Sequence, residues 1–262
     1  MTAGPHDSSE DMFGILRNLK RRKLRAQPVP SSWNEVLKKH LRFFEKLDDA
    51  EREVFFEKLQ IFLSEKSFIG AKDFNVTEEV KLVIAAQAVR LILYLDISYY
   101  NRLNEIVVYP YDYKRAVGDN TEYDGREAAY CGEVDDWSIV VLSWPSVLEG
   151  LTDANDGFNP GLHEFAHVLD RATGTFNGTP VLRKRAHYQE WAKVMSRHFL
   201  KLQKGASHQN AVLDDYGAEN EAEFFAVSTE AFFERPHEMR EMLSDLYIEL
   251  KRFYGYDPIK FL

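Results

Sequence analysis

The sequence contains almost no cysteine. Cys131 is the single cysteine among 262 residues, so the chain can form neither an internal disulfide nor a cysteine-rich zinc site. Any zinc ion would therefore have to be held by histidine and carboxylate side chains.

Long apolar runs and an excess of positive charge are also missing. The most apolar run, residues 83–95, contains Gln87 and Arg90 and is too short to span a bilayer. The first residues lack an apolar segment that ends in small side chains, so we expect no signal peptide. The net charge of −9 argues against nucleic-acid binding by the chain as a whole. With 45% hydrophobic residues the composition is that of a globular protein, which we expect to be cytoplasmic.

A histidine-rich pattern at residues 163–167, HEFAH, is the most informative feature that is present. In a helix, His163 and His167 lie on one face and can share a metal ion, while Glu164 can reach a water molecule beside it. The surroundings favour a helix, because Asn159 is a good N-cap and Gly174 suits the C-terminal end. The pattern is typical of zinc metallopeptidases.

A catalytic zinc ion needs a third protein ligand, and the spacing alone leaves its identity open. The extended metzincin pattern is excluded, because it would require glycine and histidine where this chain has Asp170 and Thr173. A predicted helix capped by Asn220 offers several carboxylates: Glu223, Glu230, Glu219 and Glu221. Glu223 could instead complete a capping box with Asn220.

Other polar residues have weaker arguments. Three further histidines lie in a basic region without a metal-site pattern, and we expect them to be exposed or otherwise hydrogen-bonded: His187, His198 and His208. Asp170 shares a helical face with both motif histidines, so it could accept a hydrogen bond from an imidazole or form a surface salt bridge.

The chain divides into three stretches. Residues 1–30 form a flexible basic leader, in which 20–23 (KRRK) follow Ile15, Leu16 and Leu19. This leader could be an amphipathic arm that touches a membrane or nucleic acid, but we favour a short helix with a solvated basic face. Residues 31–104 read as a helical portion, and 105–262 as the portion that carries the metal motif, the two forming one compact unit.

Two strands are predicted in the third stretch. The first covers 105–109, and the second covers 137–144 and is stopped by Pro145. The second strand precedes the HEFAH helix, so it could be an edge on which an extended peptide pairs its backbone, or an ordinary core strand.

Taken together, these segments resemble the Mlc titration factor A (MtfA) family of cytoplasmic bacterial zinc peptidases, over about residues 13–254. The matching segments are 62–66 (FLSEK), 84–88 (IAAQA), 108–110 (VYP), 141–144 (VLSW), 156–159 (DGFN), 163–170 (HEFAHVLD), 177–180 (NGTP) and 216–226 (YGAENEAEFFA). The chain departs from the family at Pro160-Gly161, where apolar residues are usual, and both residues are compatible with a helix start.

The resemblance implies a site and a fold. The family's zinc ligands fall on His163, His167 and Glu223, its general base on Glu164, and a tyrosine seven residues before the glutamate ligand on Tyr216. The anthrax lethal factor catalytic domain is similar at this tyrosine-to-glutamate spacing. The expected fold is α+β and mainly helical, with a gluzincin-like metallopeptidase core, a small β-sheet and an N-terminal helical portion.

The resulting expectation is a metallopeptidase with one Zn²⁺ per chain, acting on a peptide or protein substrate. The family resemblance also implies aminopeptidase-type activity and binding of Mlc, a glucose-responsive transcription repressor. The alternative is a non-catalytic, zinc-containing protein that sequesters a transcription regulator. We expect no direct contact with nucleic acid and no membrane span.

Overall fold

The structure is a computed structural model of the chain, and it describes residues 8–111, 138–152, 156–205 and 212–262. Trp137, where the second strand was predicted to start, lies outside these ranges, and so do Cys131 and His208.

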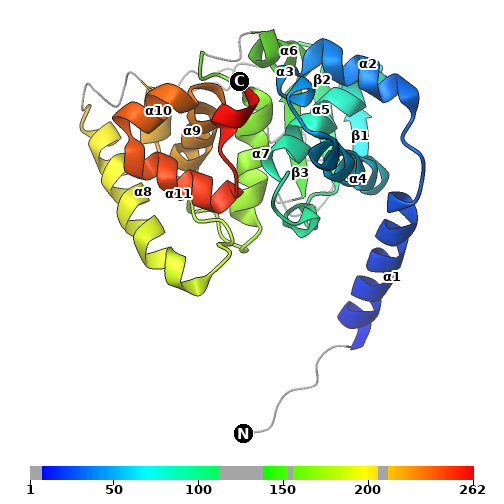
Figure 1. Ribbon diagram of the computed structural model, residues 1–262, viewed down its shortest axis with the longest axis horizontal. Helices are drawn as coiled ribbons and strands as arrows, with labels where there is room; N and C mark the ends of the chain where they lie inside the picture. The colour runs from blue at the N-terminus through cyan, green and yellow to red at the C-terminus, as the bar shows by residue number, and fades with distance from the viewer. Residues whose placement is uncertain (1–7, 112–137, 153–155, 206–211) are drawn as a thin grey trace, which may run out of the picture.

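The stretch before the sheet is helical (Figure 1): α1 Ser8–Arg25, α2 Ser31–His40, α3 Arg42–Glu45 and α4 Asp49–Glu65. The segment 1–30, expected to be a flexible leader, thus contains α1, which is attached to α4 through Arg21 and Glu65. A capping box starts α4, because the Asp48 side chain accepts from Glu51 N and the Glu51 side chain accepts from Asp48 N.

A three-stranded parallel sheet follows, in the order β1 Ser67–Gly70, β2 Glu105–Tyr109 and β3 Ile139–Ser143. The register pairs Ser67 with Glu105, and Glu105 with Ile139. Among the described residues β3 is therefore an edge strand. It is shorter than predicted, because Trp144 and Pro145 already begin the helix α6 (Trp144–Thr152).

The helix α5 (Glu78–Leu91) links β1 to β2, followed by the short 3-10 helix η1 (Ile97–Tyr100). Its N-cap is Thr77, whose side chain accepts from Val80 N. Nearly all of α5 from Leu82 onward is buried, as expected for a helix that is apolar on most of its faces.

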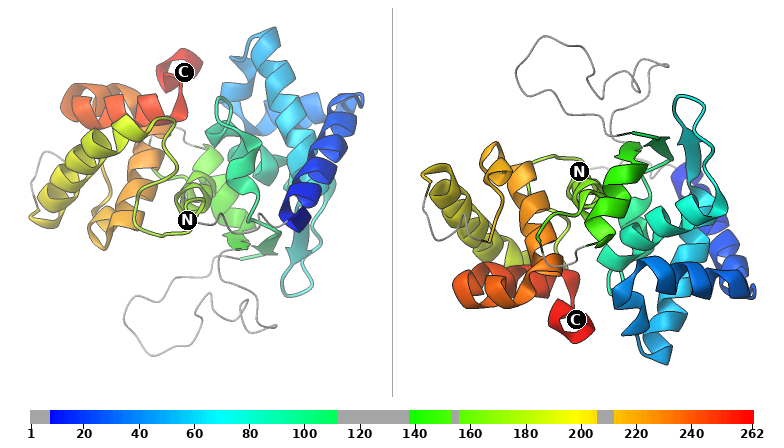
Figure 2. Two further views of the ribbon diagram at one scale, coloured as in Figure 1. Left: turned by 90° about the horizontal axis from the view of Figure 1, so that it is seen from below. Right: turned by 90° about the horizontal axis from the view of Figure 1, so that it is seen from above.

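The helix α7 (Pro160–Arg171) lies in the middle of the molecule, with the sheet and α5 on one side and the C-terminal helices on the other (Figures 1 and 2). The C-terminal elements are η4 (Arg185–His187), α8 (Tyr188–Gln203), η5 (Asp215–Ala218), α9 (Glu221–Glu234), α10 (Pro236–Met242), α11 (Ser244–Tyr254) and η6 (Pro258–Phe261). Among these, α9 packs directly along α7.

One hydrophobic core joins the two sides of α7, since it extends from Leu37 on α2 to Phe261 at the end of the chain. The prediction of a mainly helical α+β fold with a small sheet is confirmed. Within the described ranges, every helix is too short or too polar to cross a membrane.

Candidate metal centre

The local sequence around the HEFAH segment starts α7 so that both histidines face inward. The Asn159 side chain accepts from Leu162 N, and Pro160 occupies the first helical turn. Gly174, at φ +85°, ends the segment in the left-handed conformation that favours glycine. His163 and His167 are both buried, with ring centroids 4.8 Å apart.

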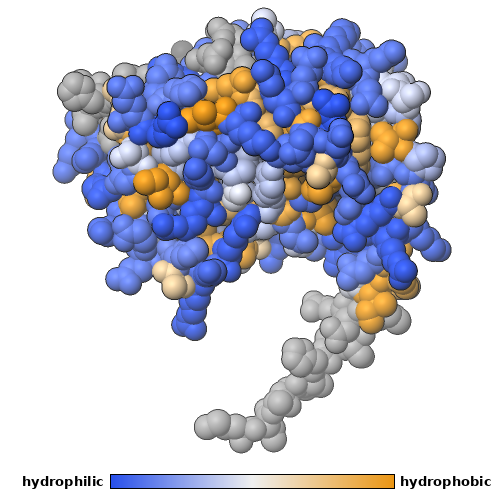
Figure 3. All heavy atoms as spheres, viewed as in Figure 1, coloured by the Kyte–Doolittle hydropathy of each residue, from blue (hydrophilic) through white to orange (hydrophobic). Residues whose placement is uncertain are grey.

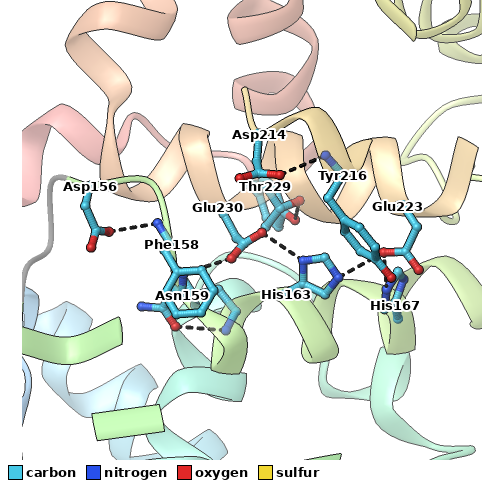
Figure 4. Close-up of polar contacts among 12 residues, drawn as sticks. Asp156, Phe158, Asn159, His163, His167, Asp214, Tyr216, Glu223, Thr229 and Glu230 are labelled. Carbon is cyan, nitrogen blue, oxygen red and sulfur yellow. Dashed lines mark hydrogen bonds and ion pairs between the residues drawn. The ribbon is translucent and has the colours of Figure 1, made fainter. Parts of the chain in front are cut away.

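The third member comes from α9. The Asn220 side chain accepts from Ala222 N and Glu223 N, which starts the helix and places Glu223 in its first turn. Glu223 Oε2 lies 3.0 Å from His163 Nε2 and 3.2 Å from His167 Nε2 (Figure 4). The Glu223 carboxylate is thus directed at the two imidazoles.

These three side chains fit a zinc ion in chemistry and in spacing. Among the described residues, His163, His167 and Glu223 form a group whose ligand atoms lie within 4.8 Å of one another. Around a tetrahedral zinc with bonds of about 2.0–2.2 Å, neighbouring ligand atoms are about 3.3–3.5 Å apart. The carboxylate-to-imidazole distances of 3.0 and 3.2 Å are close to this value.

The competing candidates lie elsewhere. Glu219 and Glu221 are exposed. His187 is half-buried beside Trp191, and His198 is buried with its Nε2 hydrogen-bonded to Asp245 Oδ1 at 2.8 Å.

Glu230, a rival ligand in the sequence analysis, lies behind His163. His163 Nδ1 hydrogen-bonds Glu230 Oε2 at 2.8 Å, and Asn159 N donates to Glu230 Oε1 at the same distance. A carboxylate on the far ring nitrogen fixes the tautomer and leaves Nε2 free to face a metal. The sequence places Glu223 and Glu230 on one helical face, but it does not show which ring nitrogen of His163 each one meets.

The electrostatics of the metal-free site show how strongly these groups interact. Burial alone lowers the pKa of His163, but the hydrogen bonds with Glu223 and Glu230 outweigh it and raise this pKa to about 10. Burial opposes ionisation of Glu223 as well, yet its bonds with both histidines hold its pKa well below the usual range. The side chains around His163 therefore favour a positive charge at this position.

Asp170 is fully buried, which excludes the surface salt bridge, one of the two alternatives for this residue. Its Oδ2 accepts from Gly178 N at 2.8 Å, which ties the end of α7 to the following loop. Asp170 Oδ1 and His167 Nδ1 are buried atoms without a hydrogen-bond partner in the described part of the chain.

Two predicted catalytic side chains border the histidine pair. Glu164 follows His163 directly and is half-buried, whereas both histidines are buried. Tyr216 is on η5, where Asp214 accepts from its backbone N, and its ring centroid is 6.0 Å from that of His163. Figure 4 shows the Tyr216 side chain extending toward His163 and Glu223. Phe176, which no sequence pattern indicated, packs its exposed ring edge-on against His167, with ring centroids 5.1 Å apart.

Comparison with known proteins identifies the family of the chain. The family model "Glucose-regulated metallo-peptidase M90" matches residues 16–255. "Uncharacterized protein slr2042" of Synechocystis sp. is 37% identical over 92% of this chain and 89% of its own length. "Mlc titration factor A" proteins of Edwardsiella ictaluri and Pectobacterium atrosepticum are each 28% identical, over 82% and 81% of this chain and 84% and 82% of their own lengths. The chain belongs to the glucose-regulated metallo-peptidase M90 family.

Proposed function

We propose that this protein is a zinc-dependent metallopeptidase in which His163, His167 and Glu223 hold the metal. The observation that carries the proposal is the convergence of two imidazole nitrogens and one carboxylate oxygen from α7 and α9. Two histidines and one glutamate leave the fourth zinc position open, as catalytic sites do, whereas a structural site has four protein ligands.

The zinc ion, when bound, would lower the pKa of a coordinated water toward about 7 and polarise the peptide carbonyl. Glu164 is the general base: it takes a proton from the attacking water and delivers it to the leaving amine. The Tyr216 hydroxyl donates a hydrogen bond to the carbonyl oxygen as negative charge develops there. Glu230 holds the ring of His163 in place through Nδ1.

The first test is the zinc content of protein purified without added metal. We expect about one zinc per chain in the unaltered protein and a clear loss in Glu223→Ala, because two ligands bind zinc far more weakly than three. Glu221→Ala is the matched control, since Glu221 is exposed in the first turn of the same helix. Absence of zinc after reloading at neutral pH, or equal loss in both variants, would contradict the proposed ligand set.

A second variant separates chemistry from metal binding. Glu164→Gln keeps the size of the side chain but removes the proton acceptor, so turnover should disappear while zinc stays bound. Peptide hydrolysis and zinc content are measured on the same preparation. Retained hydrolysis would eliminate Glu164 as the base.

For the substrate class we propose a peptide or protein, with cleavage of the aminopeptidase type, and a cytoplasmic location. The family membership supports the peptide class. Hydrolysis of a peptide with a free N-terminus, but not of the same peptide N-acetylated, is the expected result. Equal cleavage of both peptides would mean that the enzyme does not require a free amine.

A second function, binding of an Mlc-like transcription repressor, is favoured by the names of the relatives called Mlc titration factor A. In the alternative to catalysis this binding would be the whole function, and the metal would serve only the structure. A pull-down with purified repressor distinguishes the two roles, because Glu164→Gln should still capture it if binding is independent of turnover. No capture by the unaltered protein would reject repressor binding.

A further inference from the structure

The helix α1 exposes its apolar side chains instead of burying them. Ile15, Leu16 and Leu19 are 61%, 55% and 51% exposed. At about 100° per residue these three positions fall within an arc of about 100° on the helix surface. An amphipathic helix ordinarily turns such a stripe toward the protein core.

The opposite face of α1 makes the contacts with the body. Arg21 is buried and forms two 2.8 Å hydrogen bonds with the Glu65 carboxylate and one of 2.7 Å with Asn101 Oδ1. Arg21 is about 200° around the helix from Leu19. A buried, bidentate ion pair therefore holds α1 with its apolar stripe directed away from the body.

The ion pair between Arg21 and Glu65 also makes the N-terminal part of α1 project from the body of the protein. Arg21 pairs with Glu65, the last residue of α4, and Arg25 pairs with Glu57 farther back along it. Residues before Arg21 therefore extend past the end of α4, and Ile15 is about 9 Å beyond it at 1.5 Å per residue. Figure 1 shows α1 reaching outward from the body, and Figure 3 shows hydrophobic atoms on its surface.

Positive charge surrounds this stripe. Residues 17–25 contain six basic side chains and no acidic one, although the whole chain carries −9. Lys20, Arg22 and Lys23 are exposed. On the helix surface Arg22 borders one edge of the stripe and Lys20 the other. In the described part of the chain neither Arg22 nor Lys23 has an ion-pair partner.

We propose that α1 is a docking helix for an anionic phospholipid bilayer, on which it lies with Ile15, Leu16 and Leu19 inserted among the acyl chains. Basic side chains beside an exposed apolar stripe match the two components of such a surface. The acidic remainder of the protein does not prevent contact, because charges beyond a Debye length of about 8–10 Å are screened. This proposal is independent of the proposed catalytic function.

The charge and the apolar stripe of α1 favour an anionic bilayer over two other occupants, a second copy of the chain and a nucleic acid. A second copy docked through α1 would bring two strongly basic segments together, which is unfavourable. A nucleic acid would neutralise the basic side chains but would leave the apolar stripe in water. Of these three occupants, the anionic bilayer is the one that matches both the basic side chains and the apolar stripe.

The test is flotation of the full-length protein with lipid vesicles at about 0.1 M salt, where the Debye length is about 10 Å. We expect binding to vesicles of phosphatidylcholine with phosphatidylglycerol, little binding to phosphatidylcholine alone, and weaker binding at high salt. Leu16→Ser combined with Leu19→Ser should weaken binding at least tenfold. Arg22→Gln combined with Lys23→Gln should weaken it roughly thirtyfold, since each basic residue near the surface contributes about 1 kcal/mol.

The matched control is Leu200→Ser combined with Ile248→Ser, two residues on α8 and α11 that are each 51% exposed. This control should bind vesicles as the unaltered protein does. Circular dichroism and zinc content should be unchanged in every variant, because none of these side chains belongs to the core. The proposal is overturned if the unaltered protein ignores anionic vesicles, or if the control loses binding equally. It is also overturned if the α1 variants abolish a dimer that forms without lipid.

Discussion

The imidazole of His163 has a different carboxylate on each of its two nitrogens. Glu223 Oε2 lies 3.0 Å from Nε2, and Glu230 Oε2 lies 2.8 Å from Nδ1. Both carboxylates come from α9, where they lie on the same helical face, seven residues apart. The two identical side chains therefore contact opposite nitrogens of the same ring.

Replacing Glu230 by Gln should lower zinc affinity about 10–100-fold, the usual effect of losing a partner of a ligating histidine. In the unaltered protein one oxygen of Glu230 serves Asn159 N and the other serves His163 Nδ1. Glutamine has a single acceptor oxygen and cannot keep both contacts. Competition with a chelator measures the affinity.

Glu221→Gln is the control for this substitution, and its zinc affinity should be unchanged because the side chain is exposed. A purely structural role of Glu230 would lower the stability of the metal-free protein and leave the zinc affinity as it is. That outcome would contradict the positioning role.

Tyr216→Phe should lower the maximal rate by about a hundredfold, the usual cost of removing one donor to a developing oxyanion. The Michaelis constant should change much less, because this hydrogen bond is made mainly in the transition state. Steady-state kinetics with a peptide substrate provides both values. An unaltered maximal rate, at full zinc content, would show that the hydroxyl has no part in the reaction.

At the scale of elements, two asparagines start the helices that carry the site. Asn220 is exposed and caps α9. Asn159 is fully buried: it accepts from Leu162 N and Gln87 Nε2, and donates to Gly150 O and Glu234 Oε1. The same residue type thus has a local role in one helix and links several elements in the other.

The two caps should consequently differ in their contribution to stability. Asn220→Ala should lower the free energy of unfolding by about 1 kcal/mol, the ordinary value for an N-cap. Asn159→Ala should lower it by roughly 3 kcal/mol or more, because buried partners lose their hydrogen bonds as well. Urea denaturation measures both. Equal losses would mean that the buried network around Asn159 adds nothing beyond capping.

Another element, α1, shows the limit of helical periodicity. The sequence predicts a short helix with a solvated basic face, and in the structure Lys20, Arg22 and Lys23 are indeed exposed. The apolar residues Ile15, Leu16 and Leu19 are exposed as well, which the periodicity does not predict. The reason is the buried pair between Arg21 and Glu65, residues 44 positions apart, which turns a basic side chain inward. Hydrophobic periodicity describes a helix but contains no information on such a distant partner.

At the scale of the whole molecule, the proposed zinc ion would connect α7 to α9. Binding to the native state alone stabilises it by mass action, so zinc should raise the melting temperature. The effect depends on pH, because zinc requires a free Nε2 on His163. The hydrogen bonds with Glu223 and Glu230 outweigh burial and raise the pKa of this ring to about 10 in the metal-free protein.

The raised pKa of His163 determines how the stabilisation by zinc changes with pH. In the metal-free protein the proton on His163 stabilises the fold below the usual histidine pKa, and this stabilisation is lost as the pH rises toward about 10. Zinc must displace that proton, so its affinity should grow about tenfold per pH unit. The rise in melting temperature caused by zinc should therefore be larger at pH 8 than at pH 6, by roughly 5 °C.

Scanning calorimetry with and without zinc at the two pH values tests this prediction. Glu223→Ala should show no zinc-dependent shift at either pH, because the ligand set is incomplete. A shift in the unaltered protein that is independent of pH would mean that zinc does not compete with a proton at His163.

The sequence by itself determined the local features. Asn159 and Gly174 enclose one helix and Asn220 starts another, and the HEFAH spacing places His163 and His167 on one face, because caps and helical periodicity depend only on near neighbours. Tertiary structure decided which carboxylate meets the histidines. Glu223 and Glu230 share a face of α9, and the way α9 packs along α7 directs one to Nε2 and the other to Nδ1. Contacts between residues so distant in the chain are formed by packing, which local patterns do not encode.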